Sequence, residues 1–136
     1  SLGGLVSAWS AARHPERVVA LALIAPAFGM LERLVGGSEL NGGSACGVTV
    51  GQHVIDDARK FDESALPRHL TMPVWIVQGE HDEVVPITHT ERVFAAIPAD
   101  SKSMWIVDRA DHRLDAHLDA VVETLGDFIA KHSTAR

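Results

Sequence analysis

Three polar residues stand where they could together carry out nucleophilic catalysis. Ser1 precedes an apolar helix pattern, Asp82 follows one apolar strand pattern, and His112 follows another. A serine hydroxyl is a weak nucleophile until an imidazole accepts its proton, and the imidazole needs a carboxylate that fixes its tautomer. Serine, aspartate and histidine also occur here in the chain order that such a triad takes on an open α/β sheet.

The backbone beside Ser1 is a candidate for stabilising the charge that this chemistry develops. Attack on a carbonyl carbon places negative charge on its oxygen, and backbone N–H groups aimed at that oxygen lower the barrier. We expect the N–H of Leu2 to be one such donor, because it follows the candidate nucleophile. We also expect Gly3 to let the turn close where a side chain would collide with the neighbouring helix or strand.

The carboxylate of the triad has rivals within its own loop. Glu80 and Glu83 flank Asp82 closely in the sequence. The placement of Asp82 before Val84-Val85-Pro86 favours it over both, although Asp82 could also be a turn residue.

His112 also has rivals, and we do not expect it to bind a metal. His81 is interpreted as a surface residue of a loop, His117 as a residue of the final helix, and His89 remains a competitor. A metal site could be proposed from His112, Asp115 and His117. Their spacing, however, does not place all three on one helical face. We expect neither a metal nor a cofactor, because serine, imidazole and water suffice for this chemistry.

Three apolar runs would bring these residues to one edge of a sheet. They span Val18–Pro26, Val74–Val77 and Met104–Val107, and they predict strands buried on both faces. A helix pattern over Leu2–Arg13 precedes the first run, and further helix patterns follow the second and third. The last of these has an apolar stripe at Leu118, Val121, Val122, Leu125, Phe128 and Ile129. The alternation predicts a parallel α/β sheet with its active residues past the carboxyl ends of the strands.

Residues 27–72 are interpreted as a lid-like insertion. Their first half is rich in glycine, and the second half holds an amphipathic helix pattern that a Thr49-x-x-Gln52 capping box would begin. An ordinary connecting helix is the alternative for this pattern. A second box, Thr88-x-x-Glu91, is expected to begin the helix after the middle strand. Apolar residues just past the first strand are candidates for a substrate pocket: Phe28, Met30 and Leu31.

Three short motifs resemble those of the α/β-hydrolase superfamily. Ser1-Leu2-Gly3-Gly4 resembles the second half of the nucleophile elbow Gly-x-Ser-x-Gly, GEHDEVVP the acid-bearing loop, and ADHR the histidine loop. The resemblance spans the whole chain and implies a parallel-sheet α/β-hydrolase fold. It implies that Ser1 is the nucleophile, Asp82 the acid and His112 the base of a serine hydrolase. Such an enzyme would cleave carboxylic esters or thioesters through an acyl-enzyme.

Within the superfamily the sequence resembles one branch, and two motifs of the superfamily have no counterpart in it. Asp111-His112-Arg113-Leu114, with the helix pattern at 48–60, is similar to the palmitoyl-protein thioesterase and acyl-glucuronide esterase branch. The first glycine of the elbow and the upstream His-Gly segment with the other oxyanion donor have no counterpart here. We expect residues 1–136 to be the C-terminal part of one α/β-hydrolase domain of about 250 residues. Upstream chain or a partner chain is then expected to pair with the free edge of Val18–Pro26.

Composition narrows the classes of partner. The chain has 18 acidic and 12 basic residues and a formal net charge of −6, which disfavours nucleic acid and anionic surfaces as partners. No apolar run approaches the roughly 18 residues that suggest a membrane span. The single cysteine, Cys46, excludes an internal disulfide. We expect a cytoplasmic enzyme that acts on a small-molecule or acyl substrate.

Two other functions stay open. In an N-terminal-nucleophile amidohydrolase, the free α-amine of Ser1 would be the base. That function would account for a serine at position 1. It does not explain why Asp82 and His112 each follow a predicted strand, in the chain order of a triad. The other function is a non-catalytic fragment or binding module, which the incomplete oxyanion site and the exposed sheet edge would suit.

Overall fold

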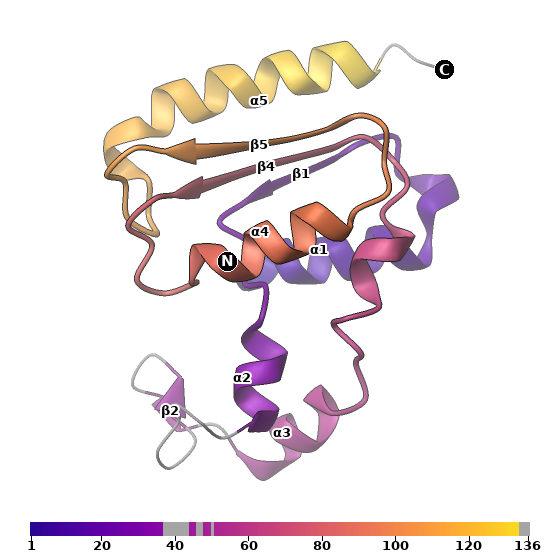
Figure 1. Cartoon of the computed structure of the whole chain (residues 1–136), viewed down its shortest axis with the longest axis vertical. Helices are drawn as coiled ribbons and strands as arrows, with labels where there is room; N and C mark the ends of the chain where they lie inside the picture. Colours follow the sequence, from indigo (N-terminus) through magenta and orange to yellow (C-terminus); the bar gives the residue numbers. More distant parts are fainter. Residues whose placement is uncertain (37–43, 46–47, 50, 134–136) are drawn as a thin grey trace.

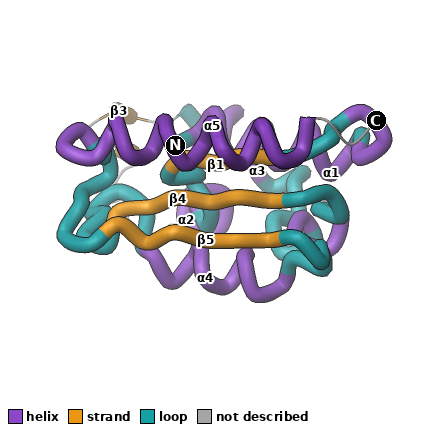
Figure 2. The backbone as a smooth tube through the Cα atoms, turned by 90° about the horizontal axis from the view of Figure 1, so that it is seen from above, coloured by secondary structure: helices purple, strands orange, loops and turns teal. Residues whose placement is uncertain are grey.

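A parallel sheet organises the protein, as the apolar runs predict. The computed structural model describes residues 1–36, 44–45, 48–49 and 51–133. Within them, the main sheet has the strand order β1 (Leu21–Ile24), β4 (Val74–Gly79) and β5 (Lys102–Val107) (Figure 2). All three strands are parallel. The central strand β4 is buried at every position, which explains its run of large apolar residues.

The first strand is shorter than predicted. The predicted strand covers Val18–Pro26, whereas pairing with β4 spans only Leu21–Ile24. A 3₁₀ turn, η1 (Pro15–Arg17), lies just upstream. At the other end, Ala25 turns into the left-handed region with φ 42°, and Pro26 has no N–H to give to a ladder. Among the described residues β1 has no partner strand on its other side.

Helices cover the sheet on both faces (Figure 1). The helices α1 (Leu2–Arg13) and α4 (Ile87–Ala96) lie on one face, and α5 (Leu118–Ser133) lies on the other. The first face holds the larger apolar cluster, which includes Leu5, Ala8, Leu23, Ile76 and Val93. The second face holds Trp75, Val77, Val107, Leu114 and Val121.

The apolar stripe predicted for the last helix is buried only in part. Val121 is buried and Leu125 and Phe128 pack beside it, whereas the other three residues are about half exposed or more. These three are Leu118, Val122 and Ile129. No helix in the described part of the chain is long and apolar enough to cross a membrane.

The segment between β1 and β4 projects to one side of the sheet (Figure 1). It contains α2 (Met30–Gly36), the antiparallel pair β2 (Ser44–Ala45) and β3 (Val48–Thr49), α3 (Gln52–Ala58) and the 3₁₀ turn η2 (Leu66–His69). Cys46 and Val50 lie outside the described residues.

Both predicted capping boxes are wrong. Thr49 belongs to β3, where it pairs with Ser44, and α3 begins after Gly51, whose extended backbone precedes the helix. The helix α4 begins after Pro86, so Thr88 lies inside it. Proline fits this position because its fixed φ suits the start of a helix and its missing N–H is not needed there. At both sites the helix begins directly after a glycine or a proline, and the threonine of the predicted capping box does not cap it.

Candidate active site

The loop that carries Asp82 (residues 80–86, the acid loop) and the loop that carries His112 (residues 108–114, the histidine loop) meet past the carboxyl ends of β4 and β5. The Nδ1 atom of His112 lies 3.0 Å from Oδ1 and 2.9 Å from Oδ2 of Asp82. The Asp82 side chain is fully buried, and the His112 side chain is 17% exposed. Because Nδ1 faces the carboxylate, Nε2 is the ring nitrogen left to exchange a proton with a substrate or nucleophile.

The Asp82 carboxylate is held by donors from its own loop. Its Oδ1 accepts hydrogen bonds from the backbone N–H groups of Val84 (2.9 Å) and Val85 (2.8 Å). Its Oδ2 accepts one from Nε2 of Gln78 (3.1 Å). These three donors hold the carboxylate in one orientation. Asp82 can therefore orient an imidazole and stabilise its positive charge.

The two loops are joined by backbone contacts. The N–H of Glu80 donates to the carbonyl of Val107 (2.9 Å), and that of His81 donates to the carbonyl of Ala110 (2.8 Å). The Glu80 carboxylate accepts from the N–H of Arg109 (3.0 Å). Of the rival residues, Glu80 thus supports the loop of His112. The exposed His81 imidazole lies 3.8 Å from the Glu80 carboxylate.

A tight turn presents His112. The Asp111 carboxylate accepts hydrogen bonds from the N–H groups of Arg113 (3.0 Å) and Leu114 (3.1 Å), as aspartate often does in turns. Arg109 and Leu114 have φ angles of 54° and 58°, a region that side chains disfavour. His112 therefore sits on a constrained segment between two left-handed residues.

Ser1 stands at the start of α1. Its carbonyl accepts hydrogen bonds from the N–H groups of Gly4 (3.0 Å), Leu5 (3.4 Å) and Ala27 (3.0 Å). Among the described residues, the Ser1 side chain makes no capping bond, although serine at this position often does. Leu2 is the first residue of α1, where N–H groups lack partners within the helix.

Ser1 lies beside the end of β1. Its backbone nitrogen is 3.3 Å from the carbonyl oxygen of Ile24. The structure brings Asp82 and His112 together, but among the described residues it gives no hydrogen bond between the Ser1 hydroxyl and His112. Catalytic hydrogen bonds often form only with substrate bound.

The close packing expected of Gly3 is made by Gly4. A Cβ at Gly3 would meet no atom of the described residues within 4 Å, so that expectation is wrong. A Cβ at Gly4 would lie 3.0 Å from the α-carbon of Pro26. Because α1 turns Gly4, not Gly3, toward the chain after β1, the second glycine is the one that permits the approach.

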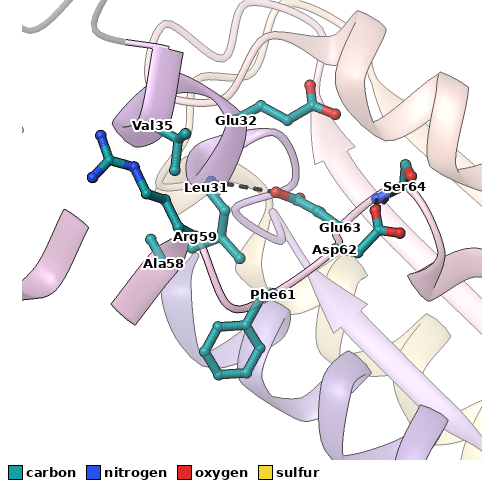
Figure 3. A pocket seen from close by; sticks show the side chains of 9 residues that line it. All are labelled: Leu31, Glu32, Val35, Ala58, Arg59, Phe61, Asp62, Glu63 and Ser64. Carbon is teal, nitrogen blue, oxygen red and sulfur yellow. Dashed lines mark hydrogen bonds between the residues drawn. The ribbon is translucent and has the colours of Figure 1, made fainter. Parts of the chain in front are cut away.

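The candidate pocket residues have different surroundings. Phe28 is 1% exposed and lies in the larger apolar cluster, against which Met30 packs. Leu31 lines a pocket of about 360 Å³ between α2 and the chain after α3 (Figure 3). The other lining residues are Glu32, Val35, Ala58, Arg59, Phe61, Asp62, Glu63 and Ser64.

A buried carboxylate that no sequence pattern marks joins the two ends of the segment between β1 and β4. Glu63 is 6% exposed and accepts hydrogen bonds from the N–H groups of Gly29 (2.5 Å) and Leu31 (3.3 Å), at the start of α2. Burial raises the pKa of the Glu63 carboxyl, and the two N–H groups oppose that rise. The same segment is tied to the acid loop, because the Arg33 guanidinium donates to the carbonyl of Val84 (3.1 Å).

No group of three or more histidine, cysteine, aspartate and glutamate residues in the described part of the chain is arranged to hold a metal ion.

Comparisons with known proteins bear on the fold. No protein-family model matches the sequence, and no curated protein does. Among solved structures, Est1E from Butyrivibrio proteoclasticus with bound ferulic acid has a TM-score of 0.83 at 23% identity and is matched over 98% of this chain and 57% of its own. The mouse alpha/beta hydrolase domain-containing protein 10 has a TM-score of 0.78 at 26% identity, over 96% of this chain and 60% of its own.

A third match agrees with these two. The esterase domain of a Rhodothermus marinus protein has a TM-score of 0.71 at 24% identity, over 96% of this chain and 58% of its own. The chain thus spans somewhat more than half the length of each of these structures. The matches show that the chain has the fold of the α/β-hydrolase superfamily over nearly its whole length.

Proposed function

We propose that the protein is a serine hydrolase that cleaves carboxylic esters or thioesters with Ser1, His112 and Asp82. The observation that carries this proposal is the bidentate contact of His112 Nδ1 with a fully buried carboxylate at the carboxyl edge of the sheet. A buried aspartate that accepts from an imidazole is the arrangement that a serine nucleophile needs. Matched structures that are named esterases have this fold as well.

The proposed reaction has two halves. The Ser1 hydroxyl oxygen attacks the carbonyl carbon while His112 Nε2 takes its proton, and the N–H of Leu2 donates to the oxygen that becomes negative. The imidazolium then gives the proton to the departing alcohol or thiol, and an acyl-Ser1 ester remains. Water, deprotonated by the same nitrogen, attacks this ester. The bond to the Ser1 oxygen then breaks, the imidazolium returns the proton to that oxygen, and the acid is released. Asp82 keeps its negative charge throughout and stabilises the imidazolium.

Residues 27–72 are proposed as the lid-like part that contacts the substrate. Leu31 and Phe61 give the pocket beside α2 an apolar part, which suits an acyl chain. The hydrogen bond from Arg33 to Val84 and the ion pair of Glu32 with Arg92 (2.7 Å) place α2 beside the acid loop and α4. Thioesters, as in the thioesterase branch that the sequence resembles, are the narrower proposal.

An active-site label tests the proposal. A fluorophosphonate probe should label the natural protein at Ser1, and Ser1→Ala should abolish both labelling and hydrolysis of p-nitrophenyl and acyl-thioester substrates. Labelling of another serine, or full activity in S1A, would overturn it. If the labelled peptide continues upstream of Ser1, the alternative with a free α-amine as base is excluded.

A further inference from the structure

A buried amide stands directly behind the acid of the candidate triad. Gln78 is a polar residue of β4 and has no exposed surface. Its neighbours on the strand, Val74–Val77, are apolar, and burying an unbonded amide costs free energy. A side chain of this kind in a central strand calls for an explanation beyond packing, since an apolar residue of similar size would fill the same space.

Both amide hydrogens of Gln78 have an acceptor. Its Nε2 lies 3.1 Å from Oδ2 of Asp82 and 2.7 Å from the carbonyl oxygen of Val85. Because both partners can only accept, the amide orientation is fixed: the NH₂ group faces the acid loop. Among the described residues, the Gln78 carbonyl oxygen has no hydrogen-bond partner. The contacts of this side chain are therefore made through its donors.

The two oxygens of Asp82 are supported from different sides. Oδ1 accepts from two backbone N–H groups of its own loop, at Val84 and Val85. Oδ2 accepts from Gln78 and faces His112, and no other donor to Oδ2 is found among the described residues. Without Gln78, only His112 would hold this oxygen.

We propose that Gln78 is a positioning residue, which holds Oδ2 of Asp82 against His112 Nδ1 and withdraws part of its negative charge. The inference rests on the proposed triad and extends it by one residue. Loss of the amide donor would let the carboxylate rotate about its own bond. It would also leave more charge on Oδ2, one of the two oxygens that contact the imidazole, and the imidazole would then keep its proton to higher pH.

The test compares Gln78→Met with Gln78→His in the natural protein, with an activated ester as substrate. Q78M has a similar length and no donor, and Q78H keeps an N–H. We expect Q78M to lower kcat by about 10- to 100-fold, which matches loss of a hydrogen bond to a charged group. KM should change less than about twofold, and the acid limb of kcat/KM should move to higher pH. Q78H should restore most of the loss.

Thr90→Val is the matched control. Thr90 is also fully buried, lies on α4 against the same face of the sheet, and has an unbonded hydroxyl among the described residues. T90V should leave kcat and the pH profile unchanged, although it too replaces a buried polar group with an apolar one. A wild-type kcat and acid limb in Q78M would overturn the inference, as would an equal effect of T90V.

Two further measurements separate the possible failures. If the Asp82→Asn variant keeps full activity, the triad itself is refuted. If D82N is inactive while Q78M has normal activity, only the role of Gln78 is refuted. If Q78M fails to melt cooperatively, Gln78→Glu replaces it, since it keeps the size and sets a second carboxyl group against Oδ2. A wild-type kcat for Q78E at pH 8 would overturn the inference.

Discussion

The α-carbon of Gly79 faces the carbonyl oxygen of Ala110 so closely that a Cβ on Gly79 would lie 2.3 Å from that oxygen. The carbonyl oxygen of Asp111 would lie at the same distance. Both obstacles are backbone atoms of the loop that carries His112, and Gly79 itself ends the strand that leads to Asp82. The absence of a side chain at Gly79 therefore sets how closely the loop of Asp82 and the loop of His112 can approach each other.

Gly79→Ala should damage stability and activity together. The added methyl group must push the histidine loop away from β4, at a cost of about 2–3 kcal/mol in the free energy of unfolding. Urea denaturation and ester hydrolysis would measure the two effects. Gly126→Ala is the control, because a Cβ there meets no described atom within 4 Å and alanine favours a helix by about 1 kcal/mol. A G79A protein as active and stable as G126A would contradict this packing.

Substitutions in the candidate triad should affect kcat and leave KM nearly unchanged. Asp82→Asn would impose the wrong imidazole tautomer and should lower kcat by about 10⁴-fold. His112→Ala should cost as much or more, because the triad members act as a unit. His81→Ala is the comparison variant, since that ring is exposed and lies 3.8 Å from Glu80. If H81A lost activity while H112A kept it, the base would be misassigned.

Stability should depend on pH through Glu63. Burial raises the pKa of this carboxyl above its usual 4.5, so folding favours the protonated form. Its contribution to stability is present below about pH 4.5 and is lost as pH rises through the folded-state pKa. Glu63→Gln cannot ionise, so the stability of wild type relative to E63Q should fall over that range.

Urea unfolding at a series of pH values would measure this difference. Glu123→Gln, an exposed position on α5, provides the background to subtract. Wild type that gains stability relative to E63Q as pH rises above 4.5 would show that the two N–H groups at Gly29 and Leu31 outweigh burial.

The fold could be predicted from the sequence because burial patterns are local. The apolar runs at 74–77 and 104–107 predicted strands that the structure confirms and extends. Burial on both faces was predicted for all three runs, but only β4 is buried throughout. That prediction is wrong for β1 and β5, which are the outer strands of the described sheet and leave Ile24 and Ile106 exposed. The limits of β1 could not be predicted, because they depend on the left-handed backbone of Ala25. Both capping boxes were wrong, since Gly51 and Pro86 already determine where α3 and α4 begin.

Some residues of the candidate site could be predicted from the sequence, and others could not. Asp82 and His112 follow strands and stand in motifs, so their approach could be anticipated. Glu63 contacts Gly29, 34 positions away, and no sequence pattern marks that pair. Gln78 did leave a signal, which is a polar residue at the end of an apolar strand. Its partner could not be identified until the path of the loop from 79 to 85 was known.

The turn that presents His112 gives the last prediction. Asp111→Ala removes the acceptor for the N–H groups of Arg113 and Leu114, and Leu114 holds a φ of 58° that a leucine does not favour by itself. The turn should relax, with a loss of about 1 kcal/mol in stability and a drop of about tenfold in kcat. Asp111→Asn keeps a carbonyl oxygen at the same place and suits the same kind of turn, so it should retain most of the activity. Stopped-flow or steady-state ester hydrolysis would compare the two variants. Equal losses in D111A and D111N would mean that the charge of Asp111, not its role as acceptor in the turn, supports His112.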